Sequence, residues 1–254
     1  MKTLIKLTWK ELNGIRMITM MFAVLVVLWQ LFLLTRVGVW PQDSMPLLAA
    51  APFFLIPVGV IIGMLYMFHM EWSTNTIYLL LSLPVRGWKV LMSKLLAALG
   101  IFVTLNLVTT ISFWLTFGRD FFDDLVRFQE GVPTEWLAAL AIKFICGYLL
   151  TMVVTIIMYQ FAYLASRLVN RFNGLLLTVT LLVQIWLFVR VGGGLAPLFE
   201  WVPDFTLRGW YHMGNDVVRV SNQVINSAPL VVIFLLTCLV FALSSWIYER
   251  EIEV

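Results

Sequence analysis

Six long apolar segments constrain this chain more than any other feature of its sequence. Each runs for about twenty residues or more, the length that an α-helix needs to cross the hydrocarbon core of a bilayer. The chain is 61% hydrophobic and only 12% charged, whereas soluble domains carry roughly twice that share of charge. We therefore expect an all-α integral membrane protein with six transmembrane helices, at about 17–35, 47–70, 95–117, 136–164, 175–195 and 229–248.

The basic residues indicate how these spans are oriented. An even number of spans places both termini on the same side of the membrane. With the termini inside, the cytoplasmic segments hold more of the lysines and arginines than the outer segments do, which favours an N-in/C-in topology. The net charge of +3 is explained by this topology signal, and we expect no nucleic acid as a partner.

Residues 1–16 have the pattern of an amphipathic helix lying at the membrane interface. Its apolar side is formed by Leu4, Ile5, Trp9, Leu12 and Ile15. Its polar side is formed by Lys2, Lys6, Lys10 and Asn13. Tryptophan favours the interface, and the lysines would face the anionic headgroups of membrane lipid. We predict an interfacial helix in which Lys2, Lys6, Trp9 and Lys10 contact the membrane surface.

The second span contains two prolines and a pair of glycines. Pro52 and Pro57 predict a bend, and Gly59 and Gly63, four residues apart, permit another helix to approach closely. Ordinary helix packing and a gate would both explain this composition.

Two outer segments have distinctive compositions. Residues 119–135 carry several acidic side chains, and we expect a solvated outer loop there. Residues 196–228 are too polar to span simply, yet they contain several aromatic residues, so we predict an outer cap or a shallow re-entrant pair of short helices. No soluble domain is expected, and residues 1–254 form a single transmembrane domain in this interpretation.

The motifs of several enzyme classes are missing. His69 and Glu71 form an isolated H-x-E, whereas a zinc protease requires H-E-x-x-H. Neither a nucleophile elbow of the form G-x-S-x-G nor a phosphate-binding loop of the form G-x-x-x-x-G-K-[ST] occurs. We therefore expect that the chain is not an enzyme, holds no metal and binds no cofactor itself.

Residues 71–94 form the longest polar interruption between spans on the predicted cytoplasmic side. Residues 76–83 read as a short helix with Thr76, Leu79, Leu80 and Leu83 on one face, ended by Pro84. Such a helix is too short to cross a bilayer, so it should lie along the membrane surface or project from it.

This segment carries a resemblance to a known family. The run Glu71-Trp72-Ser73-Thr74-Asn75-Thr76, the run Leu80-Leu81-Ser82-Leu83-Pro84-Val85, and Lys94 follow one another in an order that resembles the membrane permease subunit of an ABC transporter, type-two exporter class. The six spans and the amphipathic leader agree with it. The specific motif covers only about two dozen residues.

The resemblance implies a partner and a mechanism. Residues 76–83 would be the coupling helix that docks on a separate nucleotide-binding ATPase subunit, which binds ATP and magnesium and drives alternating access. The residues implied in this contact are Glu71, Thr76, Leu79, Leu80, Leu83, Pro84, Arg86 and Lys89. It further implies dimerisation with a second copy or a related permease, and a multi-pass location in the cell membrane, which we expect to be bacterial.

The substrate stays open. The translocation path would lie at the dimer interface, and its candidate lining residues are polar residues within spans, which avoid lipid: Asn106, Lys143, Gln160 and Gln184. Lys143 could instead snorkel outward. Two other function classes also remain open: a non-transporting membrane sensor or assembly subunit, and a membrane-embedded enzyme.

Overall fold

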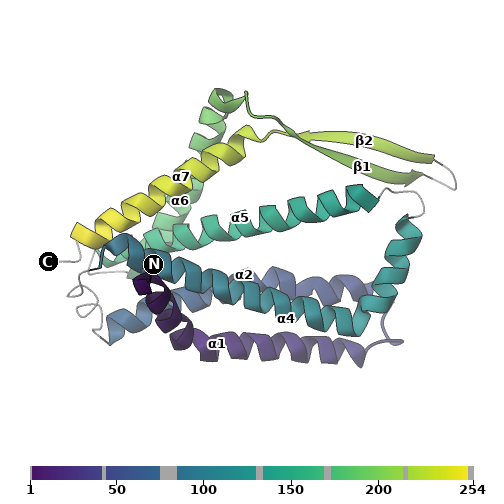
Figure 1. Ribbon diagram of the computed structural model, residues 1–254, viewed down its shortest axis with the longest axis horizontal. Coiled ribbons are helices and arrows are strands. Elements are labelled where there is room, and N and C mark those ends of the chain that lie inside the picture. Colours follow the sequence, from purple (N-terminus) through teal and green to yellow (C-terminus); the bar gives the residue numbers. More distant parts are fainter. Residues whose placement is uncertain are drawn as a thin grey trace. The chain divides into compact units, whose positions relative to one another are not determined.

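The structure is a computed structural model, and it describes residues 2–41, 44–74, 85–129, 134–168, 173–213 and 217–250. Its elements, in chain order, are α1 (Lys2–Leu34), α2 (Met45–Ser73), α4 (Gly87–Gln129), α5 (Thr134–Arg167), α6 (Asn173–Leu195), the 3-10 helix η2 (Ala196–Phe199), β1 (Phe205–Met213), β2 (Val217–Ile225) and α7 (Ala228–Arg250) (Figure 1). Within these ranges, six helices are long and apolar enough to cross a membrane, which confirms the predicted number of candidate spans.

The exposed surfaces of these helices are strongly apolar. Leu115, Phe144 and Val189 are 79%, 72% and 69% exposed, and many other large apolar side chains are exposed with them. A soluble protein rarely exposes so much contiguous apolar surface. Lipid tails are as apolar as these side chains, so this surface is expected of a chain that lies in a membrane.

The chain divides into two compact units. The first contains residues 1–125 together with 244–254, and the second contains residues 126–243. α1, α2, most of α4 and the last turns of α7 therefore belong to the first unit. The second unit contains α5, α6, the two strands and the greater part of α7.

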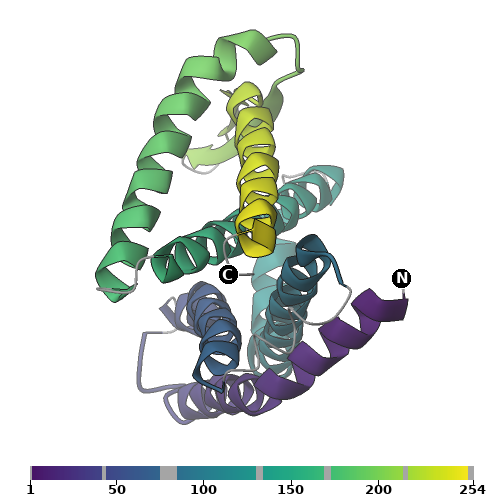
Figure 2. The same ribbon diagram turned by 90° about the vertical axis from the view of Figure 1, so that its left-hand side faces the viewer.

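α1 joins the predicted interfacial helix and the predicted first span into one element. We expected separate elements at 1–16 and 17–35, but the helix is continuous from Lys2 to Leu34. Figures 1 and 2 show its first turns, in the darkest purple, bending away from the remainder. The predicted apolar side is also divided, because Ile15 is buried against the protein while Ile5 and Trp9 are 61% and 66% exposed.

A hydrogen bond from α1 compensates for a proline in α2. Pro52 has no N–H, so the carbonyl of Leu48, four residues earlier, lacks its usual helical donor. The indole N–H of Trp29 donates to this carbonyl at 3.0 Å, and the Gln30 amide donates to the next carbonyl, that of Ala49, at 2.8 Å. A carbonyl without a donor is costly when it is shielded from water, so these two bonds stabilise the packing of α1 against α2.

The glycine pair of α2 allows close packing on two sides. A Cβ atom at Gly59 would lie 3.1 Å from the ring of Phe22 in α1. A Cβ atom at Gly63 would lie 2.9 Å from Cδ1 of Ile101 in α4. The predicted close approach is confirmed, and it involves two different neighbouring helices.

α4 is longer than predicted at both ends. We predicted a span at 95–117, but the helix runs from Gly87 to Gln129. Neither glycine nor proline occurs between Gly87 and Lys94, so Lys94 lies about two turns inside α4, whereas the predicted span at 95–117 placed it just before the helix. The outer loop predicted at 119–135 is wrong up to Gln129, because no glycine or proline interrupts the sequence between Gly118 and Gly131.

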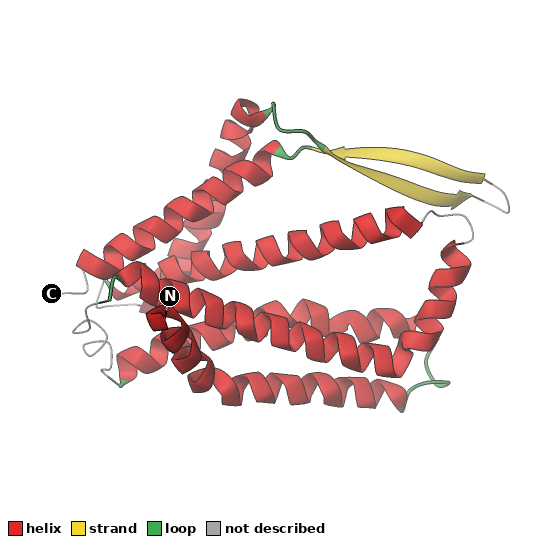
Figure 3. Ribbon diagram, viewed as in Figure 1, coloured by secondary structure: helices red, strands yellow, loops and turns green. Residues whose placement is uncertain are grey.

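Between α6 and α7 the chain forms a β-hairpin, drawn in yellow in Figure 3. β1 and β2 pair antiparallel, with Phe205 opposite Ile225 and Met213 opposite Val217. Of the two alternatives predicted for 196–228, the re-entrant pair of helices is therefore wrong, although η2 forms a single short helical turn, and the outer cap stays a prediction. The physical reason is composition: valines and an isoleucine dominate 217–225, and β-branched residues favour strands.

The base of the hairpin is held by hydrogen bonds to its two ends. The hydroxyl of Ser227 donates to the carbonyl of Pro203 at 2.9 Å, and its N–H donates to the Asp204 carboxylate at 3.3 Å. The Asn226 side chain accepts from the N–H of Ala228 at 2.8 Å and so caps the start of α7. These contacts fix where the hairpin leaves and rejoins the helical part of the second unit.

Candidate functional site

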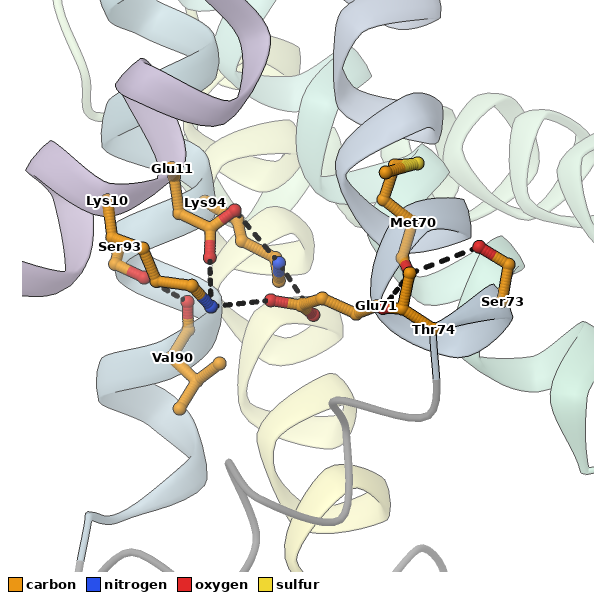
Figure 4. Close-up of polar contacts among 9 residues, drawn as sticks. All are labelled: Lys10, Glu11, Met70, Glu71, Ser73, Thr74, Val90, Ser93 and Lys94. Atoms are coloured by element: carbon orange, nitrogen blue, oxygen red, sulfur yellow. Dashed lines mark hydrogen bonds and ion pairs between the residues drawn. The ribbon is translucent and has the colours of Figure 1, made fainter.

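Four charged side chains from three helices meet in the first unit. Lys10 and Glu11 come from α1, Glu71 from α2 and Lys94 from α4 (Figure 4). The Lys94 ammonium lies 2.8 Å from the Glu71 carboxylate and 3.2 Å from that of Glu11. The Lys10 ammonium lies 3.5 Å and 3.8 Å from the same two carboxylates. We call these four residues the charge cluster.

The charge cluster is buried on one side and open on the other. The side chain of Lys94 is 0% exposed, and those of Glu11 and Glu71 are 6% and 7% exposed, whereas Lys10 is 54% exposed. Two acids balance two bases, so the cluster is neutral when all four groups are ionised. Burying unpaired charge is costly, and the pairing is what makes this placement of Lys94 tolerable.

The helices present these groups to one another for local reasons. Ile15, one turn after Glu11, is 1% exposed, so Glu11 lies on the buried face of α1. Phe68 comes one turn before Glu71 in α2, and the Lys94 ammonium lies 5.0 Å from the centre of its ring, within cation–π range. The Phe68 ring is thus a further favourable contact for the buried Lys94 ammonium.

α2 ends immediately beside the charge cluster, where hydrogen bonds from Ser73 and Thr74 satisfy a carbonyl of its last turn. The carbonyl of Met70 accepts from the N–H of Thr74 at 3.0 Å, from its hydroxyl at 2.6 Å and from the Ser73 hydroxyl at 3.2 Å (Figure 4). Local side-chain bonds of this kind offer the backbone an alternative to further helix. α2 therefore ends at Ser73, two residues after Glu71.

The predicted ATPase-contacting residues divide into two groups. Glu71 lies in the charge cluster, Arg86 is exposed just before α4, and the Lys89 ammonium lies 5.8 Å from the ring centre of Trp88. The remaining predicted residues lie outside the described part of the chain: Thr76, Leu79, Leu80, Leu83 and Pro84.

The predicted interfacial residues have different environments. Lys6 and Trp9 are exposed, and the side chain of Lys2 lies outside the described part. Lys10 is also largely exposed, but its ammonium contacts the two buried carboxylates rather than facing only outward. The first turns of α1 are thus attached to α2 and α4 through charged groups.

Glu11 is the cluster residue that sequence reasoning missed. Helical spacing places it one turn before Ile15 and seven residues after Leu4, on the side that we described as apolar. An acid on the apolar side of an amphipathic helix requires a buried cationic partner. That mismatch was the available signal.

The four candidates for a translocation path do not form one described site. Asn106 belongs to the first unit and donates to the Phe102 carbonyl of its own helix at 2.8 Å. Lys143, Gln160 and Gln184 belong to the second unit, where Lys143 is exposed and both glutamines are buried. Among the described residues, neither side-chain atom of Gln184 has a hydrogen-bond partner.

Within the described ranges, no three His, Cys, Asp or Glu side chains gather as metal ligands would. In the charge cluster each acid is paired with a base, and the pairs join α1, α2 and α4. Comparison with known proteins gave no match to a family model, to a curated protein or to a solved structure.

Proposed function

We propose that this chain is the transmembrane permease subunit of an ABC transporter of the type-two exporter class, located in the cell membrane with both termini in the cytoplasm. Residues 76–83 dock a separate ATPase subunit, whose cycle of ATP binding and hydrolysis drives alternating access. A second permease copy or a related permease completes the transporter. The proposal draws on the resemblance of residues 71–94 and on the count of six candidate spans.

The observation that carries the proposal is the charge cluster. Glu71 lies four residues before the stretch 75–84, and Lys94 lies ten residues after it. These two residues pair directly, and both contact Glu11 or its neighbour Lys10 on α1. A force applied to the polar stretch is therefore passed to α1, α2 and α4 together, because a buried and paired cluster resists separation.

Co-purification under mild extraction tests this function. The tagged chain is isolated from its native membrane in nanodiscs, and its companions are identified and counted by mass spectrometry. We expect a stoichiometric subunit that binds Mg-ATP. A reproducible homo-oligomer without an ATP-binding companion would refute the transporter proposal.

A matched pair of variants locates the contact. Leu80→Asp places a charge on the apolar face of the proposed coupling helix, and we expect about a tenfold or greater loss of bound ATPase, as for burying an unpaired charge in an interface. Leu198→Asp, an equal change at the 68% exposed Leu198 of η2, should leave the bound fraction unchanged. Equal retention of the ATPase by both variants would contradict the coupling-helix assignment.

A further inference from the structure

The last turn of α7 lies against the first turn of α4. The backbone N–H of Gly87 donates to the Glu249 carboxylate at 2.7 Å. A Cβ atom at residue 87 would lie 2.7 Å from Cγ of Glu249 and 3.0 Å from Cδ1 of Tyr248. Any side chain at position 87 would have to displace the side chains of Glu249 or Tyr248.

Glu249 lies at the C-terminal end of α7, a position that is unfavourable for an acidic residue. It is the second-last residue of α7, where the partial negative charge of the helix end disfavours an acid. α4 has no acidic residue in its first turn and carries Lys89 there, so it lacks the acid that usually stabilises a helix start. Glu249 supplies that acid from a distant part of the chain, which explains its position.

Tyr248 adds a second side chain to this contact. Its side chain is 3% exposed. Among the described residues its hydroxyl has no hydrogen-bond partner. Tyr248 thus packs over Gly87 together with Glu249.

We propose that Tyr248 and Glu249 form a clasp that positions the exit of the stretch 75–84. Glu249 acts by capping α4, and Tyr248 acts by covering Gly87. This inference rests on the proposed function, in which that stretch docks the ATPase. Glu71 fixes the entry of the stretch and the clasp fixes its exit, so the last span helps to set the docking geometry.

A disulfide tests the clasp without reference to any activity. Cys146 and Cys238, the free cysteines that the structure describes, are first replaced by serine. In the pair Gly87→Cys and Glu249→Cys, the new sulfur at 249 takes the place of Cγ, which brings the two Cβ atoms to about 4 Å, suitable for a disulfide. We expect a mild oxidant to form this bond in native membranes.

The control pair shifts one cysteine by a single residue. Arg250 is exposed and its guanidinium lies 5.6 Å from the ring centre of Trp246, so Gly87→Cys with Arg250→Cys should crosslink far less. No bond in the first pair, or equal bonding in both pairs, would overturn the clasp.

A conservative variant separates positioning from direct contact with the ATPase. Glu249→Gln keeps an oxygen that accepts from the Gly87 N–H, whereas Glu249→Ala removes it. We expect Glu249→Ala to lower the bound ATPase per chain by about threefold to tenfold, the change that loss of one helix cap corresponds to, and Glu249→Gln to retain most of it.

Each other outcome has a distinct meaning. If Glu249→Ala binds the ATPase normally, the clasp does not position the exit. If Glu249→Gln falls as far as Glu249→Ala, the charge contacts the ATPase directly and the positioning role is wrong. If the unaltered chain brings down no ATPase, the proposed function fails, and the disulfide still decides whether the clasp exists.

Discussion

Glu11 shows that the environment of a residue can depend on a partner far along the chain. Its cationic partner Lys94 lies 83 residues away, so no local motif identifies the pair. The sequence did single out Glu71 and Lys94, because they are the first and last residues of the family motif at 71–94. Glu11 had only the mismatch between its charge and its apolar side, and that mismatch does not name the partner.

Replacing Lys94 by methionine should destabilise the protein strongly. Lys94→Met removes the buried ammonium that lies 3.2 Å and 2.8 Å from the buried carboxylates of Glu11 and Glu71, whereas Lys10, which also pairs with them, is largely exposed. Removing one partner of a buried ion pair typically costs about 3–5 kcal/mol. Thermal unfolding in detergent micelles, followed by tryptophan fluorescence, should show a markedly lower midpoint for this variant.

Lys10→Met provides the matched control. Lys10 is 54% exposed, and ion pairs of exposed groups contribute about 0.2–1 kcal/mol. We expect a small shift of the unfolding midpoint. If Lys10→Met and Lys94→Met lower it equally, the buried pairing of Lys94 is not what stabilises this site.

At the scale of the element, the contribution of the Trp29 hydrogen bond to stability should depend on the presence of Pro52. Trp29→Phe removes the donor to the Leu48 carbonyl, and the expected cost is about 0.6–1.7 kcal/mol, the range of hydrogen bonds between membrane helices. Pro52→Ala restores a backbone N–H that can bond the same carbonyl. In the Pro52→Ala background, Trp29→Phe should therefore cost less.

A double-mutant cycle measures this dependence by unfolding in mixed micelles. Equal costs of Trp29→Phe in both backgrounds would show that the indole contributes by packing alone.

The hydrogen bond of Trp29 also explains its unusual position. Trp29 lies within a predicted span rather than at an interface, because its polar partner is a carbonyl that proline leaves without a donor.

The long apolar helices could be predicted from the sequence, whereas the elements that depend on weaker signals, such as the composition of a short segment, could not. The six apolar segments indicated six helices because a bilayer demands that length. In 196–228 the aromatic residues suggested short helices, but the β-branched residues of β2 favour a strand. In α4 the acidic residues after Gly118 suggested a loop, although charge alone does not end a helix.

At the scale of the whole molecule, the orientation in the membrane can be tested with single cysteines. In a variant without Cys146 and Cys238, we expect Lys6→Cys and Arg250→Cys to be protected from an impermeant maleimide added outside intact cells. Leu198→Cys, at the 68% exposed Leu198 of η2, should be labelled. The reason is the distribution of basic residues, which favours cytoplasmic termini.

The same labelling checks the number of spans. With six spans, residues 6 and 250 must lie on the same side, so their cysteines should behave alike. Opposite behaviour of Lys6→Cys and Arg250→Cys would require an odd number of crossings and would contradict the topology. Permeabilised cells, in which all three cysteines should react, show that each site is chemically competent.

The sequence alone could establish the membrane character of the molecule but not the contacts between its helices. Composition and the length of apolar segments reflect the lipid environment, which acts on the chain as a whole. The charge cluster and the contact of Gly87 with Glu249 depend on residues 83 and 162 positions apart. Such pairings follow from packing and leave little trace in local patterns.

The charge cluster also dictates an order of events during synthesis. When Glu11 leaves the ribosome, Lys94 is still 83 residues from being made, which at typical elongation rates is a delay on the order of 10 s. Until then the Glu11 carboxylate lacks its buried cationic partner. Gly87 receives its cap only 162 residues after its own synthesis. Assembly of the first unit is therefore completed only when the last span is made.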